Sequence, residues 1–286
     1  MEQLIDPVWL EENLDAPDLR ILDCMVVFER VDGVLNVESG IERWRSGHIP
    51  GSAHVDLVSD LAKADTDLRF MMPSAAQVAA VMESVGVGDG TRVVLYDSDK
   101  NMWAARVWWM LRSLGFDDAG VLDGGLKNWT AEGRPVSTEP APENPATTFT
   151  VRERPGHFVD KTTVLVAIDD ANTQIVNALP EAAHNGSTLD YGRPGHIPGA
   201  VNVPAVALVD DDTHAYVGVD QLRQQAQSVL TSGAKKTITY CGGGISAASG
   251  AFALTLLGVE NVAIYDASMG EWGYDETLPL TVPVGE

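Results

Sequence analysis

The sequence predicts an α/β protein made of two copies of one small domain, each a parallel sheet flanked by helices. Two observations carry this prediction. Short motifs return in the same order 143 to 148 residues later, and apolar runs of strand length alternate with helical patterns within each copy. Strands and helices that alternate at this spacing favour a parallel sheet covered on both faces.

The repeat begins with the motif Gly-His-Ile-Pro-Gly. It occupies residues 47–51 and 195–199, an offset of 195 − 47 = 148. Later matches in the same order are Tyr96 with Tyr240 at an offset of 144, and Leu114 with Leu257 and Trp129 with Trp272 at an offset of 143. One match could be chance, but an ordered series with slowly drifting offsets indicates a duplicated domain.

A polar, proline-rich stretch separates the two copies. Residues 137–145 contain three prolines, which disfavour a helix, and they offer no apolar face to a core. We therefore expect a first domain at residues 1–138, a linker at 139–150 and a second domain at 151–286.

The main elements of each copy follow from apolar runs and turn residues. In the first copy we expect strands at 20–23, 93–96 and 120–123, and a helix at 104–114 closed by Gly115. In the second copy we expect a strand at 237–240 and a helix at 247–257 closed by Gly258.

The charge of the chain argues against several classes of partner. With 41 acidic and 19 basic residues the net charge is 19 − 41 = −22. Such a field repels nucleic-acid phosphates and anionic lipids, so we expect neither nucleic acid nor a membrane as a partner. The first residues show no basic segment before an apolar run, and glycines break the uncharged stretch at 237–259. We therefore expect no signal peptide, no membrane span and a cytoplasmic location.

Cysteine usage points to chemistry rather than to a structural framework. Cys24 and Cys241 are the two cysteines of the chain, too few for a disulfide scaffold or a Cys-rich metal site. No Walker or dinucleotide motif follows a strand, so the sequence predicts neither a metal nor an organic cofactor. Cys24 has no glycine loop after it, and we expect it to be a buried bystander.

The most informative segment begins at Cys241, directly after the expected strand at 237–240. The loop before the expected helix consists of Gly242, Gly243, Gly244, Ile245 and Ser246, and the helix starts at Ala247. Glycines let successive N–H groups turn inward, and this nest and the helix N-terminus together stabilise a thiolate. We expect Cys241 to be a nucleophile, against the alternative of an inert buried cysteine, and Ser246 to cap the helix.

Two chemistries use a cysteine in such a loop, namely phosphoryl transfer and sulfur transfer through a persulfide. A cysteine phosphatase needs a guanidinium six residues after the cysteine to hold the phosphoryl oxygens. Position 241 + 6 is Ala247, and no basic residue follows it. This argues against a phosphatase or an arsenate reductase. A persulfide needs only amide donors, so the loop favours sulfur transfer.

The whole chain resembles a tandem-domain rhodanese-type sulfurtransferase, the family of thiosulfate and 3-mercaptopyruvate sulfurtransferases. The resemblance rests on both Gly-His-Ile-Pro-Gly motifs, on Arg-Val-Trp-Trp-Met at 106–110, on Leu-Asp-Gly-Gly-Leu at 122–126 with Trp129, and on the loop at 241–247. It implies a catalytic C-terminal domain, an inactive N-terminal domain and an active site at their interface. The first-copy position that matches Cys241 is Asp97, which cannot accept sulfur.

Two departures from the family leave the substrate open. Mercaptopyruvate-type loops have a serine where this chain has Gly243, and that serine is proposed to take part in proton transfer. A substrate-binding arginine of the family is replaced by Leu179. Arg193 lies in the loop where relatives place basic residues for the donor's anionic group, so it is our candidate for that role. The alternative is a solvated loop arginine, and His184 is a weaker candidate.

The histidines of the repeated motif, His48 and His196, occur in the active and the inactive copy alike. We therefore interpret them as structural turn residues rather than as catalytic groups.

The residues and the resemblance together predict a sulfurtransferase that works by double displacement. Cys241 attacks the sulfane sulfur of a small anionic donor, the amides of residues 242–247 hold the persulfide, and a thiol or cyanide acceptor removes the outer sulfur. The lack of positive charge after Cys241 favours 3-mercaptopyruvate over dianionic thiosulfate. The alternative is a rhodanese-fold carrier that holds a persulfide for a protein partner. The sequence leaves the oligomeric state open.

Overall fold

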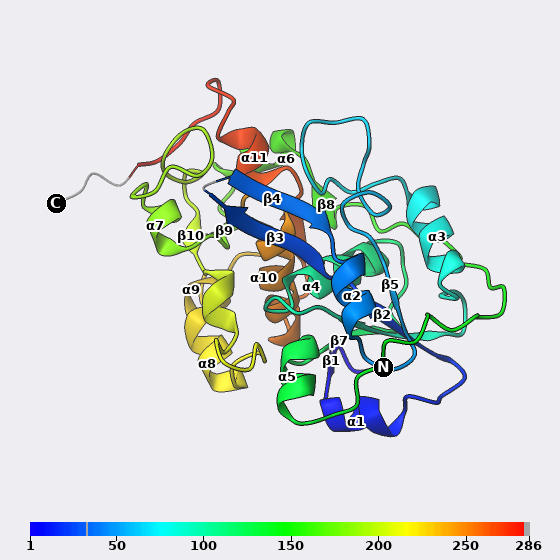
Figure 1. Cartoon of the computed structure of the whole chain (residues 1–286). Helices are drawn as coiled ribbons and strands as arrows, with labels where there is room; N and C mark the ends of the chain where they lie inside the picture. The colour runs from blue at the N-terminus through cyan, green and yellow to red at the C-terminus, as the bar shows by residue number, and fades with distance from the viewer. Residues whose placement is uncertain (33, 283–286) are drawn as a thin grey trace. The chain divides into compact units, whose positions relative to one another are not determined.

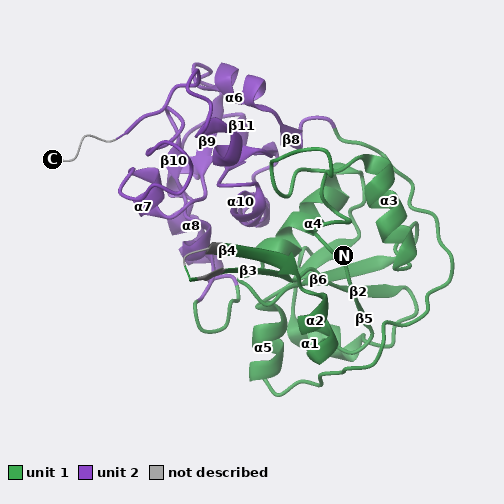
Figure 2. Ribbon diagram, turned by 45° about the horizontal axis from the view of Figure 1, so that its top comes forward, with its two compact units in different colours: residues 1–154, 211–215 green, residues 155–210, 216–286 purple. Residues whose placement is uncertain are grey.

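The computed structural model describes residues 1–32 and 34–282, and the chain divides into two compact units (Figure 2). Unit 1 comprises Met1–Arg154 and Asp211–Ala215, and unit 2 comprises residues 155–210 and those from 216 onward. Within the described part of the chain, no helix is long and apolar enough to cross a membrane.

A five-stranded parallel sheet forms the centre of unit 1 (Figure 1), with the strand order β1-β7-β6-β2-β5. The strands are β1 Leu4–Ile5, β2 Leu19–Asp23, β5 Ser52–His54, β6 Arg92–Tyr96 and β7 Ala119–Leu122. A separate antiparallel hairpin consists of β3 Val26–Val31 and β4 Val34–Ser39. The helices are α1 Pro7–Glu12, α2 Ile41–Ser46, α3 Ala75–Ser84, α4 Met102–Ser113 and α5 Gly125–Ala131.

Unit 2 repeats this sheet topology, with the strand order β8-β12-β11-β9-β10 and parallel pairs throughout. The strands are β8 Phe158–Val159, β9 Thr173–Asn177, β10 Val201–Asn202, β11 Lys236–Tyr240 and β12 Val262–Tyr265. The helices are α6 Lys161–Ala167, α7 Glu181–His184, the 3₁₀ helix η1 Ala205–Leu208, α8 Val219–Gln225, α9 Gln227–Leu230, α10 Ile245–Leu256 and α11 Ser268–Trp272. The expected fold of two parallel-sheet α/β domains is confirmed.

The repeated tyrosines make the same contact in both units. The buried hydroxyl of Tyr96 accepts a hydrogen bond from the Ile49 amide at 3.3 Å, and that of Tyr240 accepts one from the Ile197 amide at 3.1 Å. Each tyrosine ends the central strand of its sheet and fixes the Gly-His-Ile-Pro-Gly loop beside that strand. The repeat in the sequence therefore reflects a repeated packing arrangement.

The segment expected to be a linker packs against unit 1. The carbonyl of Thr148 accepts a hydrogen bond from the Asp89 amide at 2.8 Å, and the buried ring of Phe149 stacks on that of Phe116. The units consequently divide after Arg154 instead of at residues 139–150. The proline-rich composition indicates the lack of a helix, but it does not reveal the apolar anchor that Phe149 supplies.

A short segment from the second half of the chain, residues 211–215, also belongs to unit 1. The side-chain amide of Asn101 donates a hydrogen bond to the His214 carbonyl at 2.7 Å, and the Lys127 ammonium donates to the Asp211 carbonyl at 2.8 Å. The segment therefore packs on the loop that follows β6 and on α5.

The helices that follow the two central strands begin two residues earlier than expected. Helix α4 starts at Met102 and helix α10 at Ile245. The residue before each helix is left-handed, with φ of +60° at Asn101 and +81° at Gly244. This conformation turns the chain from the strand into the helix within a few residues, which keeps Cys241 close to the first turn of α10.

Candidate active site

Cys241 directly follows β11, the central strand of unit 2, and only 2% of the residue is exposed. Its amide donates a hydrogen bond to the Ser268 hydroxyl at 3.0 Å, and its carbonyl accepts one from the Met269 amide at 2.9 Å. Ser268 in turn donates to the Tyr265 carbonyl at 2.7 Å. The start of α11 thus fixes the backbone of the candidate nucleophile.

The residue before α10 is Gly244, so Ser246 is the second residue of the helix. The prediction that Ser246 caps this helix is wrong, because the left-handed conformation of Gly244 starts the helix two residues sooner. Gly244 itself has no side chain with which to cap α10. The first N–H groups of the helix follow Cys241 after three glycines, at the helix end that stabilises negative charge.

In unit 1 the equivalent loop surrounds a buried acidic side chain. Asp97 follows β6 as Cys241 follows β11, and its side chain is buried. Four backbone N–H groups donate to its carboxylate, those of Asp99 at 2.7 Å, Asn101 at 3.1 Å, Trp103 at 2.9 Å and Ala104 at 2.9 Å. The loop and the first turn of α4 therefore form an amide cradle around one carboxyl group.

The offset between the copies identifies the matching amides in unit 2. It is 241 − 97 = 144 at the strand ends and 245 − 102 = 143 at the helix starts, so the loop of unit 1 is one residue longer. The helix amides of Trp103 and Ala104 correspond to those of Ser246 and Ala247. By this correspondence, the latter two amides are the expected donors to an anionic sulfur on Cys241.

Asp97 is the titratable group of the cradle in unit 1. Burial raises the pKa of Asp97 from 3.8 to about 7, because the loss of water outweighs the hydrogen bonds from the amides. The folded state therefore keeps a proton that the unfolded chain loses near pH 4. The resulting stabilisation is complete below that pH and is lost as the pH rises through 7, about 4 kcal/mol for roughly three pKa units.

We expect the free energy of unfolding of unit 1 to fall between about pH 4 and pH 7, and this fall to be smaller in Asp97→Asn, which does not titrate. Six of the seven tryptophans precede residue 155, so urea unfolding followed by tryptophan fluorescence reports mainly on unit 1. Asparagine also lowers stability, since its NH₂ group faces N–H donors. The quantity to compare is therefore the change of the free energy of unfolding with pH, not its absolute value. The same slope in both proteins would show that Asp97 does not titrate in this range.

Tyr191 was not predicted to belong to the site, yet its phenol lies against Gly242. A Cβ added at Gly242 would lie 2.0 Å from the Tyr191 hydroxyl oxygen and 2.3 Å from its Cζ. The three nearest atoms all belong to this phenol, and Gly242 is not left-handed, so Tyr191 accounts for the glycine. The contact spans 242 − 191 = 51 positions, which no local pattern reveals. In the sequence, this contact is indicated only by Gly242 itself, a glycine that no left-handed turn requires.

The guanidinium of Arg193 is engaged by backbone carbonyls. It donates hydrogen bonds to four of them at and beyond the end of α11, those of Trp272 at 3.0 Å, Gly273 at 3.1 Å, Asp275 at 2.6 Å and Leu278 at 3.0 Å. Carbonyls at the end of a helix lack partners within the helix, and an arginine can satisfy them. This arrangement differs from the expected role in donor binding and from the solvated alternative. Arg193 instead clamps its loop to the segment after α11.

The weaker candidate, His184, does not supply positive charge. Its ring stacks on that of His196 with 3.8 Å between centroids, and burial together with this neighbour lowers the pKa of His184 to about 4. Its Nδ1 accepts a hydrogen bond from the side-chain amide of Asn177 at 3.2 Å. Leu179, at the position of the family arginine, is buried. His184 is therefore a neutral packing residue near neutral pH.

The motif histidines hold turns together, in agreement with their structural interpretation. Nδ1 of His48 bonds to the Trp44 carbonyl at 2.8 Å, and the His48 ring stacks on the indole of Trp44. Nδ1 of His196 bonds to the His184 carbonyl at the same distance. Both rings thus fix the chain that precedes the motif.

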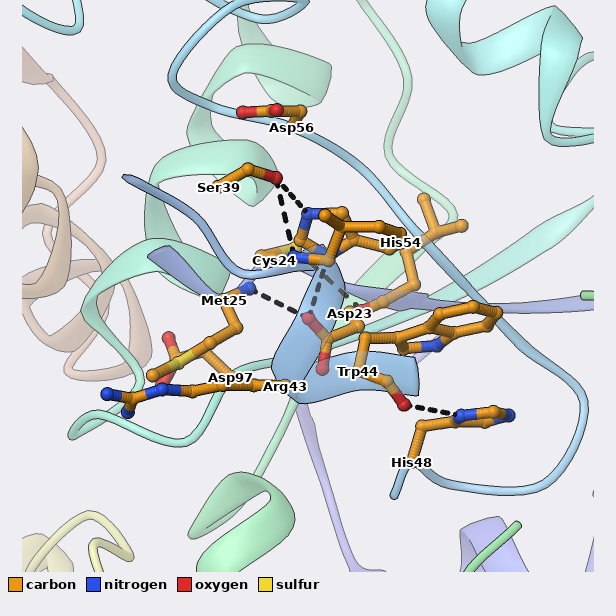
Figure 3. A network of polar contacts seen from close by, with 12 residues as sticks. Asp23, Cys24, Met25, Ser39, Arg43, Trp44, His48, His54, Asp56 and Asp97 are labelled. Carbon is orange, nitrogen blue, oxygen red and sulfur yellow. Dashed lines mark hydrogen bonds and ion pairs between the residues drawn. The ribbon is translucent and has the colours of Figure 1, made fainter. Parts of the chain in front are cut away.

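Cys24 lies in a buried network of unit 1 (Figure 3). Burial, with Asp23 and Asp97 nearby, raises the pKa of the Cys24 thiol well above its ordinary value. Beside it, Asp23 bonds to Nδ1 of His54 at 3.0 Å, and Nε2 of His54 bonds to the Ser39 hydroxyl at 3.3 Å. A buried, protonated thiol is a poor nucleophile, as expected for a bystander.

The polar groups around Cys241 suit an anion rather than a metal. Among residues 1–32 and 34–282, no group of three or more His, Cys, Asp or Glu is placed to hold a metal ion. The groups at the start of α10 are backbone N–H donors, which bind negative charge.

Comparison with known proteins places the chain in a family. The family model of the Rhodanese-like domain matches residues 6–132 and 161–275. The chain is 33% identical to the 3-mercaptopyruvate sulfurtransferase of Escherichia coli K12 over 276 residues, and this match covers 95% of each protein. It is 32% identical to the thiosulfate sulfurtransferase of Gallus gallus over 240 residues, and this match covers 81% of this chain and 80% of the chicken protein. The crystal structure of SseA from Escherichia coli matches with a TM-score of 0.81 and 31% identity over 94% of this chain and 99% of that chain. The chain therefore belongs to the rhodanese family and is a sulfurtransferase of the thiosulfate and 3-mercaptopyruvate type.

Proposed function

We propose that this protein transfers a sulfane sulfur from a small anionic donor to a thiol or cyanide acceptor through a persulfide on Cys241. The observation that carries the proposal is the setting of Cys241, a buried thiol at the end of the central strand, just before a glycine loop and the N-terminus of α10. The amide cradle of Asp97 in unit 1 supports it, because four backbone N–H groups there donate to one buried acidic side chain in the equivalent place. We place the protein in the cytoplasm, because reducing conditions there keep the Cys241 thiol free for each new reaction.

The reaction consists of two displacements. In the first, the Cys241 thiolate attacks the donor sulfur, an S–S bond forms, and the donor's bond to that sulfur breaks with its electron pair on the donor remnant. The amides of Gly242, Gly243, Gly244, Ile245, Ser246 and Ala247 then hold the outer sulfur. In the second, the acceptor attacks the outer sulfur and the Cys241 thiolate leaves. No metal or organic cofactor takes part.

We expect 3-mercaptopyruvate to be a better donor than thiosulfate. The basic residues of unit 2 are Lys161, Arg193, Arg223, Lys235 and Lys236. Arg193 is engaged by carbonyls, Lys161 pairs with acidic residues, and Lys236 begins the strand whose other end carries Cys241. Within unit 2, we therefore expect the donor to meet the loop amides and the N-terminus of α10. The N-terminus is equivalent to about half a positive charge, so this site suits a monoanion better than a dianion.

Steady-state rates with both donors and cyanide as the acceptor test this preference. We expect kcat/KM for 3-mercaptopyruvate to be higher by about tenfold, the value of one charge-assisted hydrogen bond of about 1.5 kcal/mol. A higher value with thiosulfate would refute the preference. Sulfur uptake on Cys241 without turnover on small acceptors would identify the protein as a carrier for a protein partner.

A further inference from the structure

A phenol hydroxyl reaches the cysteine loop from outside it. Gly242, Gly243 and Gly244 bring no side chains, so the loop itself offers mainly backbone N–H groups. The Tyr191 hydroxyl lies against the α-carbon of Gly242, the residue next to Cys241, where an added Cβ would come within 2.0 Å of it. A polar, half-buried side chain is therefore present at the site, although the sequence around Cys241 does not contain it.

The segment after α10 and β12 holds the tyrosine and the cysteine loop together. The Gly270 amide donates a hydrogen bond to the Gly242 carbonyl at 2.7 Å. Three residues later, a Cβ added at Gly273 would lie 2.2 Å from the Tyr191 carbonyl oxygen, so the two backbones touch. The four hydrogen bonds from Arg193 to this segment fix the loop that carries Tyr191. The position of the phenol beside Gly242 is thus set by backbone contacts on both sides.

The first displacement creates charge that a hydroxyl can stabilise. When the C–S bond of 3-mercaptopyruvate breaks, its electron pair passes to the donor remnant, whose negative charge lies largely on the enolate oxygen. The proton of the donor's own thiol is then released from the outer sulfur and ends on the remnant carbon. The products are pyruvate and the Cys241 persulfide anion, so atoms and charge balance without another reactant. A hydrogen bond that strengthens as the enolate forms accelerates this step.

We propose that Tyr191 is a catalytic residue of the first displacement, whose hydroxyl donates a hydrogen bond to the enolate oxygen of the leaving remnant, and that Arg193 positions it. The proposal rests on the proposed function of Cys241. It gives the site a side-chain hydroxyl from a loop that precedes Cys241 by 241 − 191 = 50 residues.

Tyr191→Phe tests the proposal, because it removes the hydroxyl and keeps the ring. Rapid mixing with 3-mercaptopyruvate, followed by intact mass, measures how fast Cys241 is loaded with sulfur. We expect loading to slow by about 10- to 100-fold, as for the loss of a hydrogen bond to a charged group. Release of sulfur to cyanide, from enzyme loaded with polysulfide, keeps its rate. Equal loading rates in the variant and the unsubstituted protein overturn the proposal, whereas an unsubstituted protein that takes up no sulfur refutes the proposed function.

Gly242→Ala is an independent test, since the added methyl group displaces the phenol and leaves the hydroxyl in the protein. Gly242 is not left-handed, so alanine does not strain the backbone. We expect the same slower loading as in Tyr191→Phe, and no further loss when Gly242→Ala is added to Tyr191→Ala. If Gly242→Ala slows loading equally in the unsubstituted protein and in Tyr191→Ala, the phenol has no role in this step.

Two further variants separate position from general structure. Tyr274→Phe is the matched control, because Tyr274 is 66% exposed in the segment that Arg193 clamps, and its loading rate should be unchanged. Arg193→Met is expected to slow loading as Tyr191→Phe does, and Arg193→Lys should not rescue it, since one ammonium cannot bond four separate carbonyls. Normal loading in Arg193→Met overturns the positioning role.

Discussion

Cys241→Ser is expected to abolish sulfur transfer from either donor, with a loss of about 10⁴-fold or more in kcat. A serine hydroxyl is not ionised near neutral pH, and an oxygen cannot hold the transferred sulfur as a persulfide. The substitution is nearly isosteric at a buried position, so we expect stability to change by no more than about 1–2 kcal/mol. Steady-state turnover and intact mass after donor treatment measure the result. One added sulfur should appear in the unsubstituted protein and none in the variant.

Cys24 provides the matched control for this experiment. It is equally buried, and desolvation keeps its thiol protonated by raising its pKa. Cys24→Ala should therefore keep both turnover and the added sulfur on Cys241. Turnover in Cys241→Ser, or an added sulfur on Cys24, would assign the nucleophile to the wrong residue.

The fold could be predicted because its signals are local and occur twice. Buried strands and the helices after them appear as runs of consecutive residues, and the copies share residues that make the same contact, such as Tyr96 and Tyr240. The cysteine loop could be predicted for the same reason, since strand, glycines and helix follow one another. The start of α10 could not, because Gly244 and Ser246 are both acceptable helix starts and only the backbone conformation separates them.

The roles of Arg193 and Tyr191 depend on contacts that are distant in the sequence. The charge of Arg193 is visible, but its partners are carbonyls 79 to 85 positions later, left without helical partners at and beyond the end of α11. Charge alone therefore predicts that Arg193 binds the donor, whereas in the structure its guanidinium bonds to backbone carbonyls. Tyr191 carries no charge and lies in no repeated motif. Its role could be found only by asking why Gly242 must lack a side chain.

Gly244→Val is expected to lower turnover by about 100-fold or more. Gly244 has φ +81°, a conformation that costs a β-branched residue about 1–2 kcal/mol, so the loop shifts to relieve the strain. The shift turns the amides at the start of α10 away from Cys241. Loss of one N–H donor to a reacting anion costs about 10²–10³ in rate. Turnover with 3-mercaptopyruvate and the rate of sulfur loading measure the effect.

Gly258→Val separates this loss from strain itself. Gly258 lies just after the other end of α10, has φ +86°, and has no atom within 4 Å of an added Cβ. Valine there imposes the same backbone cost on the same helix, about 1–2 kcal/mol, but leaves the amides near Cys241 in place. Urea unfolding should show similar losses of stability in both variants, while turnover falls only in Gly244→Val. Equal losses of activity would attribute the effect to destabilisation of α10, and full turnover in Gly244→Val would refute the amide cradle. Because the two variants share the strain and differ in their distance from the sulfur, the difference between their rates measures what the orientation of the amides contributes to the reaction.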